Sequence, residues 1–332
     1  MSGRACWLSA LAGGLIFALI ALLLATVGSR MPDGTIVEWC RETFGGFIGT
    51  VLLLGLAGKL LFDAFLELRI FSEVVCRAML PNTPVWVISL VLLTVAGSLA
   101  AQGTECRGRA AEILFFVVAL PLVVILIAVA VSTKYHRVLP MELPAAAGIL
   151  GGISAMSLVF QGLIFLYFIF PDLRKPAMAK GAALKSVLLT TAAVTVMVFL
   201  CLAVYGETLL AEKWMPTLQM LARVSFTGVF LARQDVLLLW FWMASVCIFL
   251  SGTLFYGSLM GVRLFHQREE KRKNWLFLCI IAIFALSFLP RNLSAAYQLR
   301  LLIAPWLNLI YFIILPIALL LFGRRKGGGD HA

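Results

Sequence analysis

The run FIGTVLLLGLAGKLLFDAFLELRIFS, from Phe47 to Ser72, decides the fold class. It has 26 residues, most of them apolar, and at 1.5 Å per residue a helix of that length crosses the roughly 30 Å of hydrocarbon in a bilayer. In lipid, only helices and closed barrels satisfy their own backbone hydrogen bonds, and a barrel would show short alternating segments instead. The run therefore predicts a membrane-spanning α-helix.

Composition extends this prediction to the whole chain. Hydrophobic residues make up 62% of the 332 positions and charged residues 13%, which is about half the charged share of a soluble domain. We expect an all-α polytopic protein of the cell membrane, with a single transmembrane domain over residues 1–332. The nine expected spans are residues 7–27, 47–72, 85–101, 111–131, 146–170, 183–205, 236–261, 275–289 and 304–322.

The basic residues predict the orientation of these spans. Lys and Arg are enriched in the cytoplasmic connections of membrane proteins. One set of alternate connections carries 16 Lys and Arg residues and the other set carries 9, which predicts a cytoplasmic C-terminus and places Met1 outside. We interpret the net charge of +11 and the basic cluster Arg263–Lys273 as a topology signal and a contact for anionic membrane lipids, not as a nucleic-acid-binding surface.

No pattern typical of an enzyme or a metal site occurs in the sequence. The seven cysteines are scattered without C-x-x-C spacing, His136 and His266 fall in predicted loops, and His331 falls in the C-terminal tail. A Walker-type loop, an H-E-x-x-H motif and a G-x-S-x-G motif are all absent from the sequence. We therefore expect no catalytic residue, no metal ligand and no cofactor.

The second span carries charged residues at membrane depth. Lys59, Asp63 and Glu67 follow one another at four-residue spacing, which places them on one face of a helix. Charges in this position are costly and typical of functional sites, and an acidic pair beside a lysine suits a cation, a proton or an amine substrate. The structural alternative is that Asp63 neutralises Lys59 while Glu67, Arg69 and Glu73 approach the outer interface. The sequence leaves both interpretations open.

The fifth span opens with the glycine-rich stretch Gly148–Ala155, and Gln161 and Gly162 follow further along. Glycine costs about 1 kcal/mol relative to alanine inside a helix, so a broken helix is expected here. Such breaks free backbone groups that hold ligands in transporters with inverted repeats. Close helix packing through small residues explains the glycines equally well and needs no ligand.

Short motifs follow one another in order from Arg4 to Phe322. They are Pro32 with Thr35–Glu38 and Phe44-Gly45, Leu68-Arg69 with Glu73, Leu80–Trp86, Gly103–Glu105 with Arg109–Glu112, Phe170–Asp172, Trp214–Thr217, Phe230–Asp235 with Trp240, and the late prolines Pro305 and Pro316. Each motif is weak alone. Their shared order resembles the permease-like B subunit of spore germination receptors, a branch of the amino acid-polyamine-organocation (APC) transporter superfamily.

This resemblance implies an inverted-repeat helix bundle of the LeuT/APC type with about ten spans. The spans of this chain resemble the second to the tenth, so the family's first helix has no counterpart here; a shortened chain, a misassigned start codon or a decayed gene would each explain this. In the superfamily the ligand lies between the broken first and sixth helices, and the sixth corresponds to Gly148–Phe170. The implied ligand-binding residues are Gly151, Gly152, Ile153 and Ser154 through their backbone, and Gln161 through its side chain.

The resemblance also implies a function. We expect a germinant-sensing subunit in the spore inner membrane that binds a small nutrient, such as an amino acid, and acts with an A-type membrane subunit and a C-type lipoprotein subunit. One alternative is a secondary transporter of amino acids or amines, with Asp63 or Glu67 as the coupling carboxylate. Ile164 stands where we expect relatives to carry an acidic residue, which weakens cation-coupled transport. The other alternative is a structural membrane subunit without a ligand.

Overall fold

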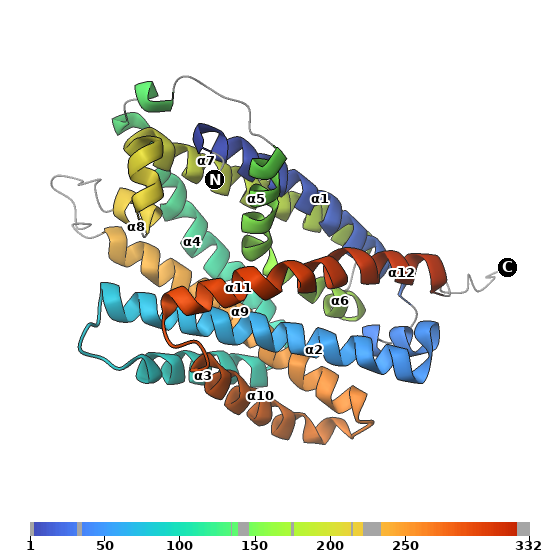
Figure 1. Ribbon diagram of the computed structural model, residues 1–332. Coiled ribbons are helices and arrows are strands. Elements are labelled where there is room, and N and C mark those ends of the chain that lie inside the picture. The colour runs from blue at the N-terminus through green and yellow to red at the C-terminus, as the bar shows by residue number, and fades with distance from the viewer. Residues whose placement is uncertain are drawn as a thin grey trace. The chain divides into compact units, whose positions relative to one another are not determined.

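The computed structural model of the protein describes residues 3–31, 35–133, 135–138, 146–173, 176–213, 215–221 and 234–323. Regular secondary structure in these ranges is entirely helical (Figure 1), which confirms the all-α prediction. The elements are η1 (Gly3–Ala5), α1 (Cys6–Arg30), α2 (Ile36–Ala78), α3 (Val85–Ala101), α4 (Thr104–Ser132), η2 (Tyr135–Val138), α5 (Ala146–Val159), η3 (Gln161–Phe165), α6 (Leu166–Ile169), η4 (Phe170–Asp172), α7 (Pro176–Glu212), α8 (Pro216–Leu221), α9 (Gln234–Leu264), η5 (Glu269–Lys271), α10 (Arg272–Ser287), α11 (Leu293–Asn308), η6 (Leu309–Ile314) and α12 (Leu315–Phe322).

Several of these helices are long and apolar enough to cross a membrane. Six helical runs in the described residues meet that test, and a seventh does so if α5 and the helical turns after it count as one broken span. The helix α3 is apolar but only 17 residues long. The polytopic membrane class is thus confirmed, and the number of nine spans stays a prediction.

The chain divides into two compact units. Unit 1 consists of Met1–Ala21, Glu112–Phe160 and Ala182–Ala244, and unit 2 consists of Leu22–Ala111, Gln161–Gly181 and Ser245–Ala332. The terminal Arg324, Arg325 and Lys326, which contributed to the predicted cytoplasmic C-terminus, lie outside the described residues. The sidedness of the protein therefore stays a prediction.

Unit 1 is packed through small residues. A Cβ atom added to Gly152 in α5 would lie 2.1 Å from the backbone oxygen of Ser9 in α1, and one added to Gly13 would lie 2.8 Å from the oxygen of Gly152. Likewise, Gly14 faces the side chain of Thr191 in α7, where a Cβ would lie 2.1 Å away. The helices α1, α5 and α7 approach one another this closely because glycine allows it.

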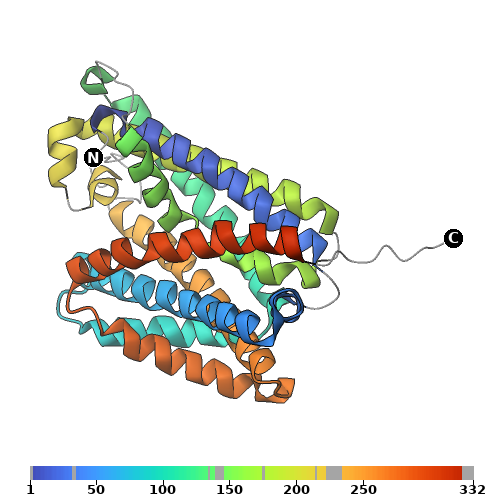
Figure 2. The same ribbon diagram turned by 45° about the vertical axis from the view of Figure 1, so that its right-hand side comes forward.

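Unit 2 is built around α2. This helix contacts α3, α10, α11 and α12, and in both views the orange-to-red run of α11 lies alongside the light-blue α2 (Figures 1 and 2). Thr35 and Glu38 form a capping box at the start of α2, which satisfies backbone groups of the first turn. Gly45 has a positive φ of 80° and kinks the helix there, so the stretch Ile36–Phe44 forms a separate short entry helix.

The predicted break in the fifth span occurs later than the glycine content suggests. Gly148–Ala155 lies within the regular helix α5, which ends at Val159, and a 3-10 helix begins at Gln161. The backbone therefore breaks at Phe160, and the glycine-rich stretch remains helical because Gly152 packs directly on Ser9. Tertiary packing here outweighs the low helix propensity of glycine.

The last helical run also differs from the predicted span. It begins at Leu293, although the expected span started at Ala304, and continues as α11, η6 and α12 to Phe322. Asn292 caps its start by accepting a hydrogen bond of 2.8 Å from the backbone N–H of Ala295. Leu309–Ile314 is a π-helix, a local widening that frequently occurs at functional sites.

Candidate functional site

The first candidate cluster surrounds Lys59. Its side chain is 0% exposed, and its ammonium group donates 2.7 Å hydrogen bonds to Asp63 Oδ2 and to Asn308 Oδ1 of α11. The same nitrogen lies 5.0 Å from the ring centroid of Phe312, a distance at which a cation is attracted to an aromatic face. This geometry matches the structural alternative from the sequence, in which Asp63 neutralises Lys59.

The second candidate cluster joins three elements of unit 2. Arg300 of α11 donates a 2.9 Å hydrogen bond to Glu67 Oε2 of α2 and a second hydrogen bond to Gln161 Oε1 of η3. The amide nitrogen of Gln161 donates to the same Glu67 oxygen at 3.2 Å. Glu67 thus lies buried inside the helix bundle of its unit.

One nitrogen of the Arg300 guanidinium makes no hydrogen bond among the described residues. Arg300 is only 4% exposed, and its Nε–H has no hydrogen-bond partner among the described residues. A buried donor without an acceptor costs about 1–3 kcal/mol, so an oxygen atom from a small molecule would be stabilised there. Arginine is well suited to this role because its planar fork matches a carboxylate.

Two tyrosine hydrogen bonds join the helices around this cluster. Tyr167 of α6 is fully buried, and its hydroxyl donates a 2.6 Å hydrogen bond to the carbonyl of Tyr311 in the π-helix η6. The hydroxyl of Tyr311 in turn donates to the carbonyl of Leu52 in α2 at 3.1 Å. Gly55 makes room for it, since a Cβ at that position would lie 2.0 Å from the Tyr311 oxygen. The π-helix is therefore bonded to both α2 and α6.

The predicted site residues fall into two groups. Gly151, Gly152, Ile153 and Ser154 belong to α5 in unit 1, where backbone N–H and C=O groups are used by the helix itself. Gln161 and Glu67, which the sequence placed in separate candidate sites, bond directly to each other in unit 2. Among the residues that the structure describes, His, Cys, Asp and Glu side chains form no group of three able to hold a metal ion.

Sequence reasoning missed Arg300 and Asn308. Arg300 lies in the part of the last helical run that precedes the predicted span 304–322, so it was counted among the connecting residues, whereas Asn308 lies inside that span and carries no charge. A usable signal was present, because Arg300 and Asn308 are eight residues apart in the sequence, as are Lys59 and Glu67. Two pairs of residues with equal spacing can meet when their helices run antiparallel, and the contacts Lys59–Asn308 and Glu67–Arg300 have that order.

Comparisons of the sequence with known proteins identify a family and several relatives of this chain. The family described as spore germination protein matches residues 2–296. Spore germination protein YndE of Bacillus subtilis (strain 168) is 23% identical over 98% of this chain and 88% of its own length. Spore germination protein B2 of that organism is 24% identical over 88% and 79%, and spore germination protein KB is 22% identical over 100% and 91%.

These matches settle the family. The family match extends over most of the chain, and the three relatives are matched over most of their own lengths. The Lys59–Asp63 ion pair and the interrupted helix lie within residues 2–296, as does Glu67, whereas its partner Arg300 lies beyond them. The chain is a member of the permease-like family of spore germination proteins.

Proposed function

We propose that this chain is the nutrient-sensing subunit of a spore germination receptor, and that a small nutrient with a carboxylate group, such as an amino acid, binds at Glu67, Gln161 and Arg300. The main support for this site is the buried Arg300 Nε–H, which has no acceptor among the described residues. Family membership supports the general role, and the arginine supports the chemistry of the ligand because charge-assisted pairs with carboxylates are strong.

Gln161 supplies the coupling in this proposal. It is the first residue after the break at Phe160, and its side chain bonds to both Glu67 and Arg300. A ligand carboxylate that binds Arg300 competes with the Gln161 carbonyl oxygen, while a ligand ammonium group competes with its amide nitrogen for Glu67. Binding would therefore change how the segment after the break is held, and different ligand affinities in the two arrangements suffice to shift a two-state equilibrium.

We propose a ligand at Gln161 and not at Gly151, Gly152, Ile153 and Ser154. Gly151 to Ser154 remain within α5, and the buried Gly152 is accounted for by its contact with Ser9. Glu67 and Arg300 replace them in the proposed site because they are charged, buried and bonded to Gln161.

Signal transfer would require further subunits. Relatives of this chain include proteins named spore germination protein B2 and spore germination protein A2. We propose that this chain acts with an A-type membrane subunit and a C-type lipoprotein subunit in the spore inner membrane, with its C-terminus in the cytoplasm. Its basic residues would contact anionic lipids there.

Secondary transport is the alternative, and the ion pairs disfavour it. Asp63 is 2.7 Å from the ammonium group of Lys59, and Glu67 is 2.9 Å from the guanidinium of Arg300. A coupling carboxylate has to exchange its partner cation in each cycle, whereas both carboxylates here are already paired with resident cations. Sensing needs no such exchange.

The experiment is a thermal-unfolding screen of the full chain in detergent micelles against a panel of amino acids. A ligand at about one hundred times its dissociation constant stabilises the folded state by about 2.7 kcal/mol, so we expect at least one amino acid to raise the unfolding temperature. Uptake of that amino acid into vesicles against a gradient, lost in Asp63→Asn, would instead favour transport. No stabilisation by any member of the panel would contradict the proposed ligand class.

A further inference from the structure

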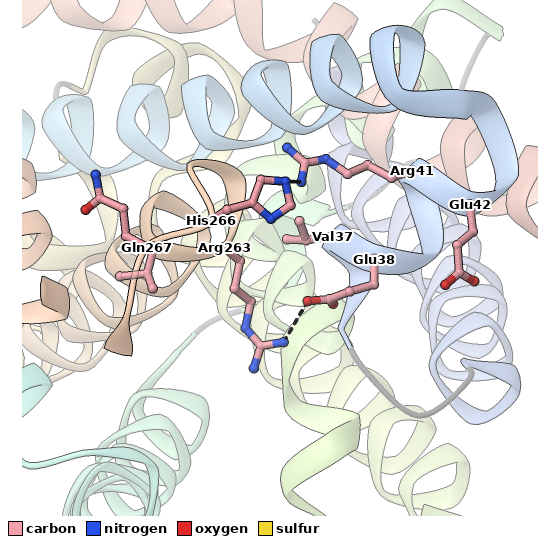
Figure 3. A pocket seen from close by; sticks show the side chains of 8 residues that line it. Val37, Glu38, Arg41, Glu42, Arg263, His266 and Gln267 are labelled. Atoms are coloured by element: carbon pink, nitrogen blue, oxygen red, sulfur yellow. Dashed lines mark hydrogen bonds and ion pairs between the residues drawn. The ribbon is translucent and has the colours of Figure 1, made fainter. Parts of the chain in front are cut away.

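A cavity of about 520 Å³ lies where the entry helix of α2 meets the end of α9, within unit 2 (Figure 3). Its lining residues are Val37, Glu38, Arg41, Glu42, Val262, Arg263, His266 and Gln267. Two of the side chains are arginines and two are glutamates, so the lining is electrically balanced only when His266 is neutral. The sequence-based orientation places this end of α9 on the cytoplasmic side.

His266 has an unusual backbone conformation. It is the one non-glycine residue with a positive φ in the described ranges, at 49°. Its N–H bonds to Arg263 O at 3.3 Å and the N–H of Gln267 bonds to Val262 O at 2.9 Å, which is the Schellman pattern of a helix C-terminus. Glycine normally fills this position because it has no Cβ. The turn alone therefore does not account for an imidazole here.

The imidazole is engaged by an arginine. Arg41 Nη1 lies 2.7 Å from His266 Nε2, and Arg41 Nη2 donates a 2.8 Å hydrogen bond to the carbonyl of Leu264 (Figure 3). A guanidinium group has only donors, so His266 Nε2 must be the acceptor. In this contact the imidazole is neutral and carries its proton on Nδ1. A protonated imidazole has no lone pair to offer Arg41.

The remaining charged groups of the cavity lining are Arg263, Glu38 and Glu42. Arg263 of α9 donates a 3.0 Å hydrogen bond to Glu38 of α2, which also accepts from the backbone N–H of Thr35 at 2.7 Å. Glu42 of α2 completes the charged lining. From α10, the neighbouring side chain is the uncharged Trp275, which donates to Gln267 at 3.1 Å. Protonation of His266 would therefore place a third cation beside two guanidinium groups.

The Arg41 contact joins the end of α9 to the entry helix of α2. The entry helix Ile36–Phe44 is separated from the rest of α2 by the kink at Gly45. The entry helix packs closely against Gly49 in the next part of α2, because a Cβ atom added to Gly49 would lie 2.8 Å from the backbone oxygen of Cys40. Within the entry helix, Cys40 is fully buried, so its accessibility reports whether the helix stays in place.

We propose that Arg41 and His266 form a proton-operated latch, which holds the entry helix of α2 against the end of α9 while His266 is neutral and releases it when His266 is protonated. Imidazole is the side chain that ordinarily changes charge between about pH 5 and 8. The latch would make the sensing subunit respond to pH on the predicted cytoplasmic side.

The first test measures the alkylation rate of Cys40 by an uncharged maleimide, in the full chain with its six other cysteines replaced by alanine. The matched control is His266→Asn in that background, because asparagine tolerates positive φ, can accept from Arg41 and does not titrate. Dividing the two rates at each pH removes the intrinsic pH dependence of the thiol. We expect the ratio to be about one near pH 8 and to rise about two- to five-fold near pH 5.5, as fits an exposed polar contact. An equal ratio at both pH values would overturn the latch.

A second measurement covers the case in which Cys40 is never labelled. The chain has three histidines, so nitrogen NMR of histidine-labelled protein can identify the His266 signal by its absence in His266→Asn. We expect a neutral imidazole protonated on Nδ1 near pH 8, and loss of that preference in Arg41→Gln. A signal protonated on Nε2 would contradict the proposal. Neither readout needs a nutrient, so the latch and the ligand site can fail independently.

Discussion

Arg300 in α11 donates a hydrogen bond of 2.9 Å to Glu67 in α2, although the two residues are 233 positions apart in the sequence. The same guanidinium bonds to Gln161 and retains a buried Nε–H without an acceptor among the described residues. An arrangement of this kind, with one ion pair and one guanidinium nitrogen without an acceptor beside a helix break, is suited to bind a small carboxylate reversibly.

The Lys59–Asp63 pair should be essential for stability. In Lys59→Met, the buried Asp63 carboxylate loses its cation, and breaking a buried ion pair from one side typically costs about 3–5 kcal/mol. The double variant Lys59→Met/Asp63→Leu removes both charges and should recover most of this loss. Thermal unfolding in detergent micelles measures both variants. A single variant as stable as the original protein would show that the pair contributes little.

Gly151 and Gly152 should respond in opposite ways to alanine. A Cβ on Gly152 would lie 2.1 Å from the Ser9 backbone oxygen, so Gly152→Ala should lower the unfolding temperature by forcing α1 and α5 apart. A Cβ on Gly151 has no atom within 4 Å, and alanine is favoured over glycine by about 1 kcal/mol in a helix. Gly151→Ala should therefore be neutral or stabilising and leave the nutrient response intact. Loss of that response without loss of stability would return Gly151 to the ligand site.

The buried hydroxyl of Tyr167 should contribute measurably to the π-helix. Tyr167→Phe removes its 2.6 Å hydrogen bond to Tyr311 O and should cost about 1–3 kcal/mol because that carbonyl loses a buried donor. Tyr135→Phe is the matched control, since the exposed Tyr135 makes a bond of equal length to Ala130 O and should change stability by less than about 0.5 kcal/mol. Equal effects in the two variants would argue against a special role for the Tyr167 contact.

Gln161 should separate ligand response from folding. Gln161→Ala removes the side chain that links the break to Glu67 and Arg300, but leaves the direct ion pair between those two residues in place. We expect normal membrane insertion and a lost or strongly weakened nutrient response. The measurement is nutrient-triggered germination of spores that carry the variant, with membrane content checked by immunoblotting. A full response would exclude Gln161 as the coupling residue.

The sequence predicts the position of some residues of the candidate site and not of others. The four-residue spacing of Lys59, Asp63 and Glu67 predicts their shared face correctly because helix geometry alone determines it. Gln161 was also singled out, although the break was expected in the glycine-rich stretch before it. Its actual position at Phe160 depends on how Gly152 packs against Ser9, a contact between distant segments that helix propensity does not include.

Arg300 shows the opposite case. A search for long apolar runs starts the last span at Ala304, because Leu293–Asn308 mixes polar and apolar residues. Arg300 then counts as a connecting residue, whereas the structure buries it against Glu67 and Gln161. Hydropathy does not detect a charged residue whose burial is made possible by partners elsewhere in the chain.

The most direct measurement is the ligand-induced rise in unfolding temperature of Arg300→Lys, for whichever amino acid stabilises the original protein. Lysine keeps the positive charge beside Glu67 but lacks the planar fork and the Nε–H that we assign to the ligand carboxylate. Arg291→Lys, at an exposed position just before α11, is the matched control. We expect that the ligand no longer stabilises Arg300→Lys while it still stabilises Arg291→Lys. Equal stabilisation of both variants would contradict a ligand site at Arg300.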